Sequence, residues 1–164
     1  MSSLMNLILF NWPIPSHLPT EIQIVCNDLR AEKNQEAALQ KAYELLSLRF
    51  GSSKWLTYVL LWRIFDRNLH RIWQRTEFLH CTHMNWLLKI LLVRSGWFAE
   101  DDITERWTIL SGFSPHQYVR VRLKDGRSIA VDVWGRTYGV PLGKYAHGFK
   151  ATTFPVWNDQ SSPT

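Results

Sequence analysis

The sequence has few cysteines. Only two of its 164 residues are cysteine, Cys26 and Cys81, and no Cys-x-x-Cys pair occurs. Two cysteines so far apart do not make the disulfide framework of a small secreted domain, and they do not supply the ligands of a zinc finger. We therefore expect a protein of a reducing compartment that needs no metal and no other cofactor.

The sequence also lacks a long apolar run. A membrane-spanning helix needs roughly 18 to 20 consecutive apolar residues, and no stretch approaches that length. The apolar run at residues 4–10 is interrupted by Asn6 and has neither a basic leader nor a small-residue cleavage site. We expect no membrane span and a mature, cytoplasmic N-terminus.

Positive charge is in small excess. Nineteen Lys and Arg against 14 Asp and Glu give a net charge of +5, which favours weak attraction to acidic partners and does not indicate nucleic-acid binding. What the chain does have is apolar and aromatic content: 46% hydrophobic residues, with nine Trp and eight Phe. A chain of this length and composition is expected to bury a core without disulfides or metal.

The order of sequence patterns predicts an α+β fold in a single domain over residues 1–164. A proline-rich start precedes helix-type periodicity, strand-type alternation comes next, and a polar tail ends the chain. We expect an N-terminal arm at 1–20, a helical half at 21–96, a β half at 113–150 and a polar tail at 158–164.

Two long helices are predicted upstream of Cys81. Residues 21–26 fit a short strand or a turn of helix, and Asn27 and Asp28 offer caps for a helix over residues 31–50. A second helical pattern covers residues 54–74. A separate polar, acidic segment at residues 100–105 is expected on the surface.

Four arginines recur at intervals of four along the second predicted helix and its end: Arg63, Arg67, Arg71 and Arg75. On one helix they would form a ribbon, because each step of four residues turns by about 40° beyond a full turn. Such a ribbon is either the solvated face of an amphipathic helix or a surface for an acidic partner. No aromatic residues alternate with the arginines as a single-stranded nucleic-acid platform requires.

Cys81 stands at the start of a third predicted helix, which Gly96 is placed to end. Steps of three, four, seven and eleven residues from Cys81 fall on one helix face, which is occupied by Met84, Asn85, Leu88 and Leu92. The thiol is therefore expected to point inward, toward whatever this helix packs against.

A thiol in the first turn of a helix lies near unpaired backbone N–H groups and the positive end of the helix dipole. Both favour the thiolate, and no Ser, Thr, Asp or Asn immediately precedes Cys81 to occupy those donors. The N–H groups are then open to a thiolate or to a developing oxyanion. The alternative is that Cys81 is a small apolar core residue, a common role of free cysteine.

The chain changes to a period of two after residue 113. Residues 116–123 alternate, residues 128–133 alternate again, and a turn sequence lies between them, which predicts a β-hairpin. The length of the turn decides which side chains share a face of this hairpin.

Two registers are open for the hairpin. A type I turn at 124–126, with its glycine left-handed, makes Asp132 face Tyr118 and puts His116 on the same face at roughly 7 to 8 Å, diagonal to Asp132. A two-residue turn at 125–126 shifts the pairing by one and sends Asp132 to the other face. The first register permits a Cys-His-Asp triad, and we prefer it.

In this order, a cysteine at a helix start, a histidine at a strand start and an aspartate on the paired strand, the sequence resembles the transglutaminase-like branch of the papain-type cysteine enzymes. The resemblance lies in the segment from Cys81 to Gly96, the strand and turn at 116–126, and the strand that ends in Asp132. It implies a papain-like fold in which the nucleophile-bearing helix packs on a small antiparallel sheet.

The resemblance also implies the chemistry. Cys81 would attack an amide carbonyl of a protein or peptide, His116 would activate the thiol and protonate the leaving amine, and Asp132 would orient the histidine. The resulting thioester is hydrolysed by water, as in a peptidase or amidase, or intercepted by an amine, as in a cross-linking enzyme.

Further residues have candidate roles. The backbone N–H of Cys81 is the expected first oxyanion donor, with Gln74 or Trp73 as candidates for the second. His147 is a second candidate base in a predicted glycine-rich loop. His80 and His83 lack the remaining ligands of a recognisable zinc site, so we expect no metal.

Trp134 would lie opposite His116 in the preferred register, where it would shield the imidazole, line a substrate groove or fill the core. Three functions stay open at this point: a cysteine hydrolase, an acyltransferase, and a non-catalytic module that binds an acidic partner through the arginine ribbon.

Overall fold

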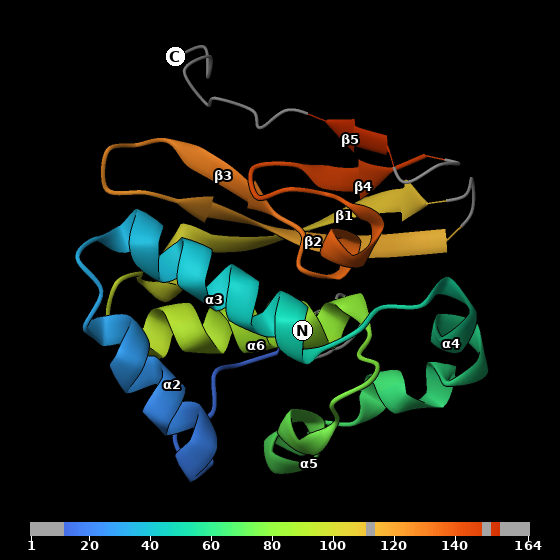
Figure 1. The fold of residues 1–164 in the computed structure, drawn as a ribbon, viewed down its shortest axis with the longest axis horizontal. Helices are drawn as coiled ribbons and strands as arrows, with labels where there is room; N and C mark the ends of the chain where they lie inside the picture. The colour runs from blue at the N-terminus through green and yellow to red at the C-terminus, as the bar shows by residue number, and fades with distance from the viewer. Residues whose placement is uncertain (1–11, 111–113, 149–151, 155–164) are drawn as a thin grey trace, which may run out of the picture.

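The computed structural model describes residues 12–110, 114–148 and 152–154. Helices occupy the first part of this chain and strands the second, which confirms the predicted α+β class (Figure 1). The elements in chain order are α2 (Thr20–Arg30), α3 (Gln35–Arg49), α4 (Lys54–Val59), the 3-10 helix η1 (Leu61–Phe65), α5 (Leu69–Gln74), α6 (Cys81–Arg94), the 3-10 helix η2 (Glu100–Asp102), β1 (Ile103–Leu110), β2 (Ser114–Arg122), β3 (Ser128–Val131), the 3-10 helix η3 (Trp134–Tyr138), β4 (Tyr145–His147) and β5 (Thr152–Phe154).

Helix α6 is the centre of the core. Every residue from Thr82 to Leu92 is buried, because α2, α3 and β2 all pack against this helix. Figure 1 shows α6 behind α3 and below the sheet. The one cation in the buried run, Lys89, is neutralised by Glu100 at 3.0 Å and Glu105 at 3.3 Å. Truncating a leucine of this helix to alanine would cost about 2 to 5 kcal/mol.

The predicted hairpin and its register are confirmed. Strands β2 and β3 pair with Val119 opposite Val131, the register of the type I turn with a glycine bulge. The Leu123 N–H donates to the Arg127 carbonyl, and Gly126 adopts the left-handed φ of 87° that the bulge requires.

Strand β1 was not predicted. The β half begins at Ile103 and not at residue 113, because part of the segment 100–105 pairs antiparallel with β2 as the edge of a three-stranded sheet in the order β1-β2-β3. Its side chains are mostly half-buried or exposed, so its sequence carries little apolar alternation. Gly148, just after β4, bonds to Ile109 of β1 and joins the two-stranded β4-β5 sheet to the first.

The first two helices differ from prediction in their limits. Residues 21–26 belong to the eleven-residue helix α2, whose N-terminal cap is Pro19, and they form neither a strand nor a single turn. Helix α3 begins at Gln35, after the residue predicted as its start. Its cap is Asn34, whose side chain accepts the Ala37 N–H, so the caps predicted at residues 27–28 are wrong.

The predicted continuous helix over residues 54–74 is wrong. It is three short elements, α4, η1 and α5. Between η1 and α5, Asp66 and Asn68 use their side chains to satisfy local backbone N–H groups. Asp66 accepts the N–H of Asn68 at 3.0 Å, and Asn68 accepts that of Arg71 at 2.9 Å, which caps α5. This local competition ends one helix and starts the next.

The arginine ribbon predicted for that helix is therefore not formed. Arg71 in α5 and Arg75 at the end of α5 both form ion pairs with Asp66. The guanidinium of Arg63 lies over the ring of Trp62, at 5.2 Å from its centroid. The other arginine of the set, Arg67, lies over the Trp12 ring.

The proline-rich arm packs on α6 over its described part. Trp12 is buried, and the indole N–H of Trp86 donates to the Pro13 carbonyl at 3.1 Å. The apolar run at 4–10 and the predicted polar tail at 158–164 lie outside the described residues. Among the residues that the structure describes, no helix is both long and apolar enough to cross a membrane.

Candidate active site

Cys81 is the first residue of α6, as predicted. His80 precedes it with extended backbone angles, and no side chain caps the helix start. The thiol is partly buried and lies against the core. The backbone N–H groups of the first turn therefore have no side-chain acceptor, which leaves them available to an anion beside the thiol.

His116 and Asp132 meet as the preferred hairpin register predicts. His116 Nε2 lies 2.8 Å from Asp132 Oδ2, and both side chains are almost completely buried. His116 is near the start of β2, and Asp132 is the residue directly after β3, the strand that pairs with β2. Since Nε2 is committed to the carboxylate, the other ring nitrogen, Nδ1, is left for the thiol of Cys81.

Asp132 is held by two backbone donors besides the histidine. The Gly135 N–H donates to Oδ1 at 2.8 Å and the Ala146 N–H to Oδ2 at 2.9 Å. Gly135 must be glycine for this approach, because a Cβ there would lie 2.6 Å from Oδ2 and 3.0 Å from a methyl carbon of Val140. These bonds fix the carboxylate in the orientation that binds His116.

The imidazole is strongly biased toward its protonated form. Burial alone would lower the pKa of His116, but the charge and hydrogen bond of Asp132, and then the interaction with Cys81, raise it to about 10. The Trp134 ring lies against the imidazole, with the centroids 5.1 Å apart. Trp134 also lines the cavity at the site and belongs to the core, so the three predicted alternatives are not exclusive.

A cavity of about 160 Å³ opens beside the thiol and the imidazole. It is smaller than the roughly 300 to 1,000 Å³ of pockets that enclose a whole drug-sized ligand, so it suits a side chain or a short segment of a chain. Three groups of residues form its walls: Cys81, His116 and Trp134; Lys54, Thr57 and Tyr58 from α4; and Leu110, Ser114 and Pro115 from the facing ends of β1 and β2.

Helix α4 is held against this cavity by hydrogen bonds to η3. Ser52, just before α4, donates from Oγ to the Trp134 carbonyl at 2.8 Å. The Lys54 N–H donates to the Tyr138 hydroxyl at 3.0 Å, and its ammonium lies over the same ring. The α4 wall is thus tied to the element that follows Asp132.

His80 and His83 hold the same segment from the side of α6. His80 Nε2 lies 3.3 Å from the Thr57 carbonyl, and His83 Nε2 lies 2.8 Å from that of Asp66. Burial lowers the pKa of both, that of His83 to about 4, so they are neutral partners of backbone groups. In the described part of the chain no group of three or more His, Cys, Asp or Glu side chains is placed to hold a metal.

Two predicted candidates lie outside the cavity. Gln74 donates to Glu21, and Trp73 packs edge-on against Phe50, so neither is placed to be the second oxyanion donor. His147 is exposed in β4 and not in a loop, and its Nδ1 bonds the Thr108 hydroxyl.

Sequence reasoning missed the α4 wall and the backbone donors to Asp132. The motif of Cys81, His116 and Asp132 says nothing of residues 54–58, which reach the cavity through tertiary contacts alone. A glycine three residues after the aspartate was the only available signal for the Gly135 contact.

The second cysteine provides a contrast within the same chain. Cys26 is 2% exposed in α2, and burial raises the pKa of its thiol to about 11. Both cysteines are free thiols, but the side-chain charges that act on Cys26 come from Arg30 and Arg94 and not from an imidazole. Cys26 therefore has the environment of an inert core thiol.

Comparison of the chain with protein-family models, with curated proteins and with solved structures finds no match.

Proposed function

We propose that this protein is a cysteine hydrolase, a peptidase or amidase that cleaves amide bonds of proteins or peptides through Cys81, His116 and Asp132. The observation that carries the proposal is the buried 2.8 Å bond between His116 and Asp132 beside a thiol at a helix start. An imidazole with this partner and this raised pKa accepts the proton of the thiol readily.

The reaction proceeds in two stages. The Cys81 proton moves to His116, and the sulfur attacks the amide carbon to give a tetrahedral oxyanion beside the first-turn N–H groups. The C–N bond then breaks as His116 returns the proton to the departing amine, which leaves a thioester on Cys81. Water attacks the thioester, with His116 taking one of its protons, and the acid product leaves as the thiol is restored.

Asp132 acts through His116 in this scheme. Its carboxylate faces Nε2 and keeps Nδ1 directed at the sulfur, and it stabilises the imidazolium that forms in each stage. Trp134 and the surrounding core exclude water from this pair, which strengthens the interaction between its charges.

The proposal includes a papain-like, transglutaminase-like architecture for the fold, supported by a thiol on the central helix and a His-Asp pair on the sheet packed against it. It includes a cytoplasmic, reducing location, supported by two free thiols.

A peptide-mapping assay tests the activity. Purified protein is incubated with a mixture of unfolded proteins such as casein, and new termini are identified by mass spectrometry. We expect cleavage by the wild type and none by Cys81→Ala, with Cys26→Ala active as the control. Cleavage that survives Cys81→Ala would exclude the proposal.

The same experiment separates hydrolysis from acyl transfer. With a labelled primary amine added, hydrolysis leaves free carboxyl termini, whereas transfer attaches the amine to the acyl fragment. Predominant labelling would assign the protein to the acyltransferases and not to the hydrolases.

A further inference from the structure

The segment α4–η1, which forms one wall of the cavity, exposes a concentration of large apolar side chains. Six of the eleven exposed large apolar residues in the described part of the chain lie within it. We call these six the α4–η1 patch: Trp55, Tyr58, Val59, Leu61, Trp62 and Phe65.

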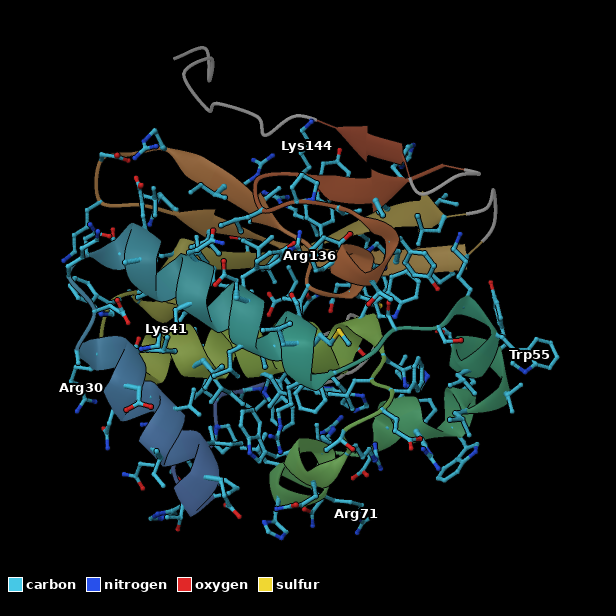
Figure 2. All side chains as sticks on the ribbon, viewed as in Figure 1. Arg30, Lys41, Trp55, Arg71, Arg136 and Lys144 are labelled. Carbon is cyan, nitrogen blue, oxygen red and sulfur yellow. The ribbon has the colours of Figure 1, made fainter. Side chains whose placement is uncertain are left out.

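The patch is not the outer side of a buried core element. Neither α4 nor η1 buries a single residue, although the segment is strongly apolar in sequence. Trp55 is 73% exposed, Trp62 67% and Phe65 69%, and Figure 2 shows Trp55 projecting away from the body of the molecule. A surface of this kind marks a place where another molecule docks.

The patch continues into the candidate active site. Tyr58 belongs to both, and its neighbours Lys54 and Thr57 line the cavity beside Cys81. A chain that enters the cavity from this side must therefore cross α4 and contact the patch. The walls contributed by Leu110, Pro115 and Trp134 are apolar as well.

The segment that carries the patch has an excess of basic residues. Between residues 51 and 76 there are five basic residues and one acidic residue, Asp66, which is already bound to Arg71 and Arg75. In the part of the chain that the structure describes, no carboxylate forms a salt bridge with Lys54, Arg63 or Arg67. A ligand with acidic side chains would find these cations beside the apolar surface.

We propose that the α4–η1 patch is the docking surface of the substrate, and that the substrate is a protein segment with large apolar side chains flanked by acidic residues. This inference rests on the proposed function, because it assigns the substrate class of the same site. Apolar residues of the segment cover the patch and enter the cavity, while its carboxylates pair with the surrounding cations.

Binding is measured first without catalysis, by fluorescence anisotropy with the Cys81→Ala protein. The probe is a short fluorescein-labelled peptide with phenylalanine and leucine at its centre and glutamates on both sides. A second peptide has lysine in place of each glutamate. We expect the acidic peptide to bind, the basic peptide to bind at least about tenfold more weakly, and added salt to reduce this difference.

A matched pair of variants locates the binding. Trp62→Gln/Phe65→Gln removes two exposed side chains of the patch, whereas Ile24→Gln/Leu48→Gln removes two exposed side chains of α2 and α3. We expect the patch variant to weaken peptide binding at least about tenfold and the control to leave it unchanged. Equal binding by both variants, or equal loss in both, would overturn the proposal.

Two further arms separate the possible failures. Sedimentation with phosphatidylcholine vesicles that contain phosphatidylserine tests a membrane partner; vesicle binding that needs the patch, without peptide binding, would overturn the proposal. With Cys81 intact, peptide binding without cleavage would leave the docking surface supported and refute the proposed function. Cleavage of the peptide at the same rate by the wild type and by the patch variant would support the proposed function and refute the docking surface.

Discussion

Replacing Cys81 with alanine should make the stability of the protein fall as the pH rises above neutrality. The pKa of His116 is raised to about 10 in the folded protein, against about 6.5 in an unfolded chain. Burial opposes this rise, and the charge and hydrogen bond of Asp132 are the largest causes in its favour. They remain when the thiol is removed, so the variant should still hold the proton.

The sign and size follow from proton linkage. Between the unfolded and folded pKa values of His116, folded Cys81→Ala binds one proton more than the unfolded chain. Its stabilising effect is complete below about pH 6.5 and is lost as the pH rises through the folded pKa. Full linkage of one proton gives a slope of about −1.4 kcal/mol per pH unit, and hence a loss of about 1.4 kcal/mol between about pH 7 and 8.

The wild type should behave differently. If the thiol proton already resides on His116, the folded pair holds one proton, and the unfolded chain holds one on the thiol between about pH 6.5 and 8.5. Unfolding then exchanges no net proton from this pair, and its contribution to stability is flat in the same interval. The thiol therefore changes the slope, and not only the height, of the stability curve.

Urea unfolding at a series of pH values measures these slopes. Cys81→Ala/Asp132→Asn is the control, because it removes the charge that raises the pKa of His116, and its curve should lose the slope. His80 and His83, whose pKa values are lowered by burial, contribute equally to all three proteins. Parallel curves for the wild type and Cys81→Ala would refute the placement of the thiol proton on His116.

Two other substitutions test the surroundings of the pair. Gly135→Ala puts a methyl group 2.6 Å from Asp132 Oδ2, and should cost about 1 to 3 kcal/mol in urea unfolding and at least about tenfold in peptide cleavage; unchanged cleavage would show that the bond between Gly135 and Asp132 is dispensable. His147→Gln changes an exposed side chain outside the cavity, and peptide cleavage should stay within about twofold of the wild type, a difference below about 0.5 kcal/mol; a large loss would reinstate His147 as the base.

The register of the hairpin was predictable because it is set locally. The turn at residues 124–126 needs a left-handed glycine, and Gly126 has φ 87°. That one choice of turn determines that His116 and Asp132 share a face, so two of the candidate site residues could be brought together from sequence alone. The start and end of α6 were local signals of the same kind.

The elements that were mispredicted depend on competing or distant contacts. The helical periodicity of residues 54–74 is interrupted at Asp66 and Asn68, whose side chains accept hydrogen bonds from backbone N–H groups in competition with a continuous helix. Strand β1 is held in the sheet by its pairing with β2. Most of its side chains are half-buried or exposed, so its sequence resembles that of a loop. The α4 wall of the cavity depends on hydrogen bonds to Trp134 and Tyr138, some eighty residues away. A local sequence pattern cannot predict contacts at that separation.

The most direct test of the central claim is the pH dependence of alkylation of Cys81 by iodoacetamide, compared in the wild type and in His116→Gln. Peptide mapping by mass spectrometry reads the two cysteines separately, and the buried Cys26 is the internal control. We predict that Cys81 of the wild type reacts well below the ordinary thiol pKa of about 8.5, and that this reaction is lost in His116→Gln. A Cys81 that reacts only near that pH in both proteins would contradict the thiolate–imidazolium pair on which the proposed function depends.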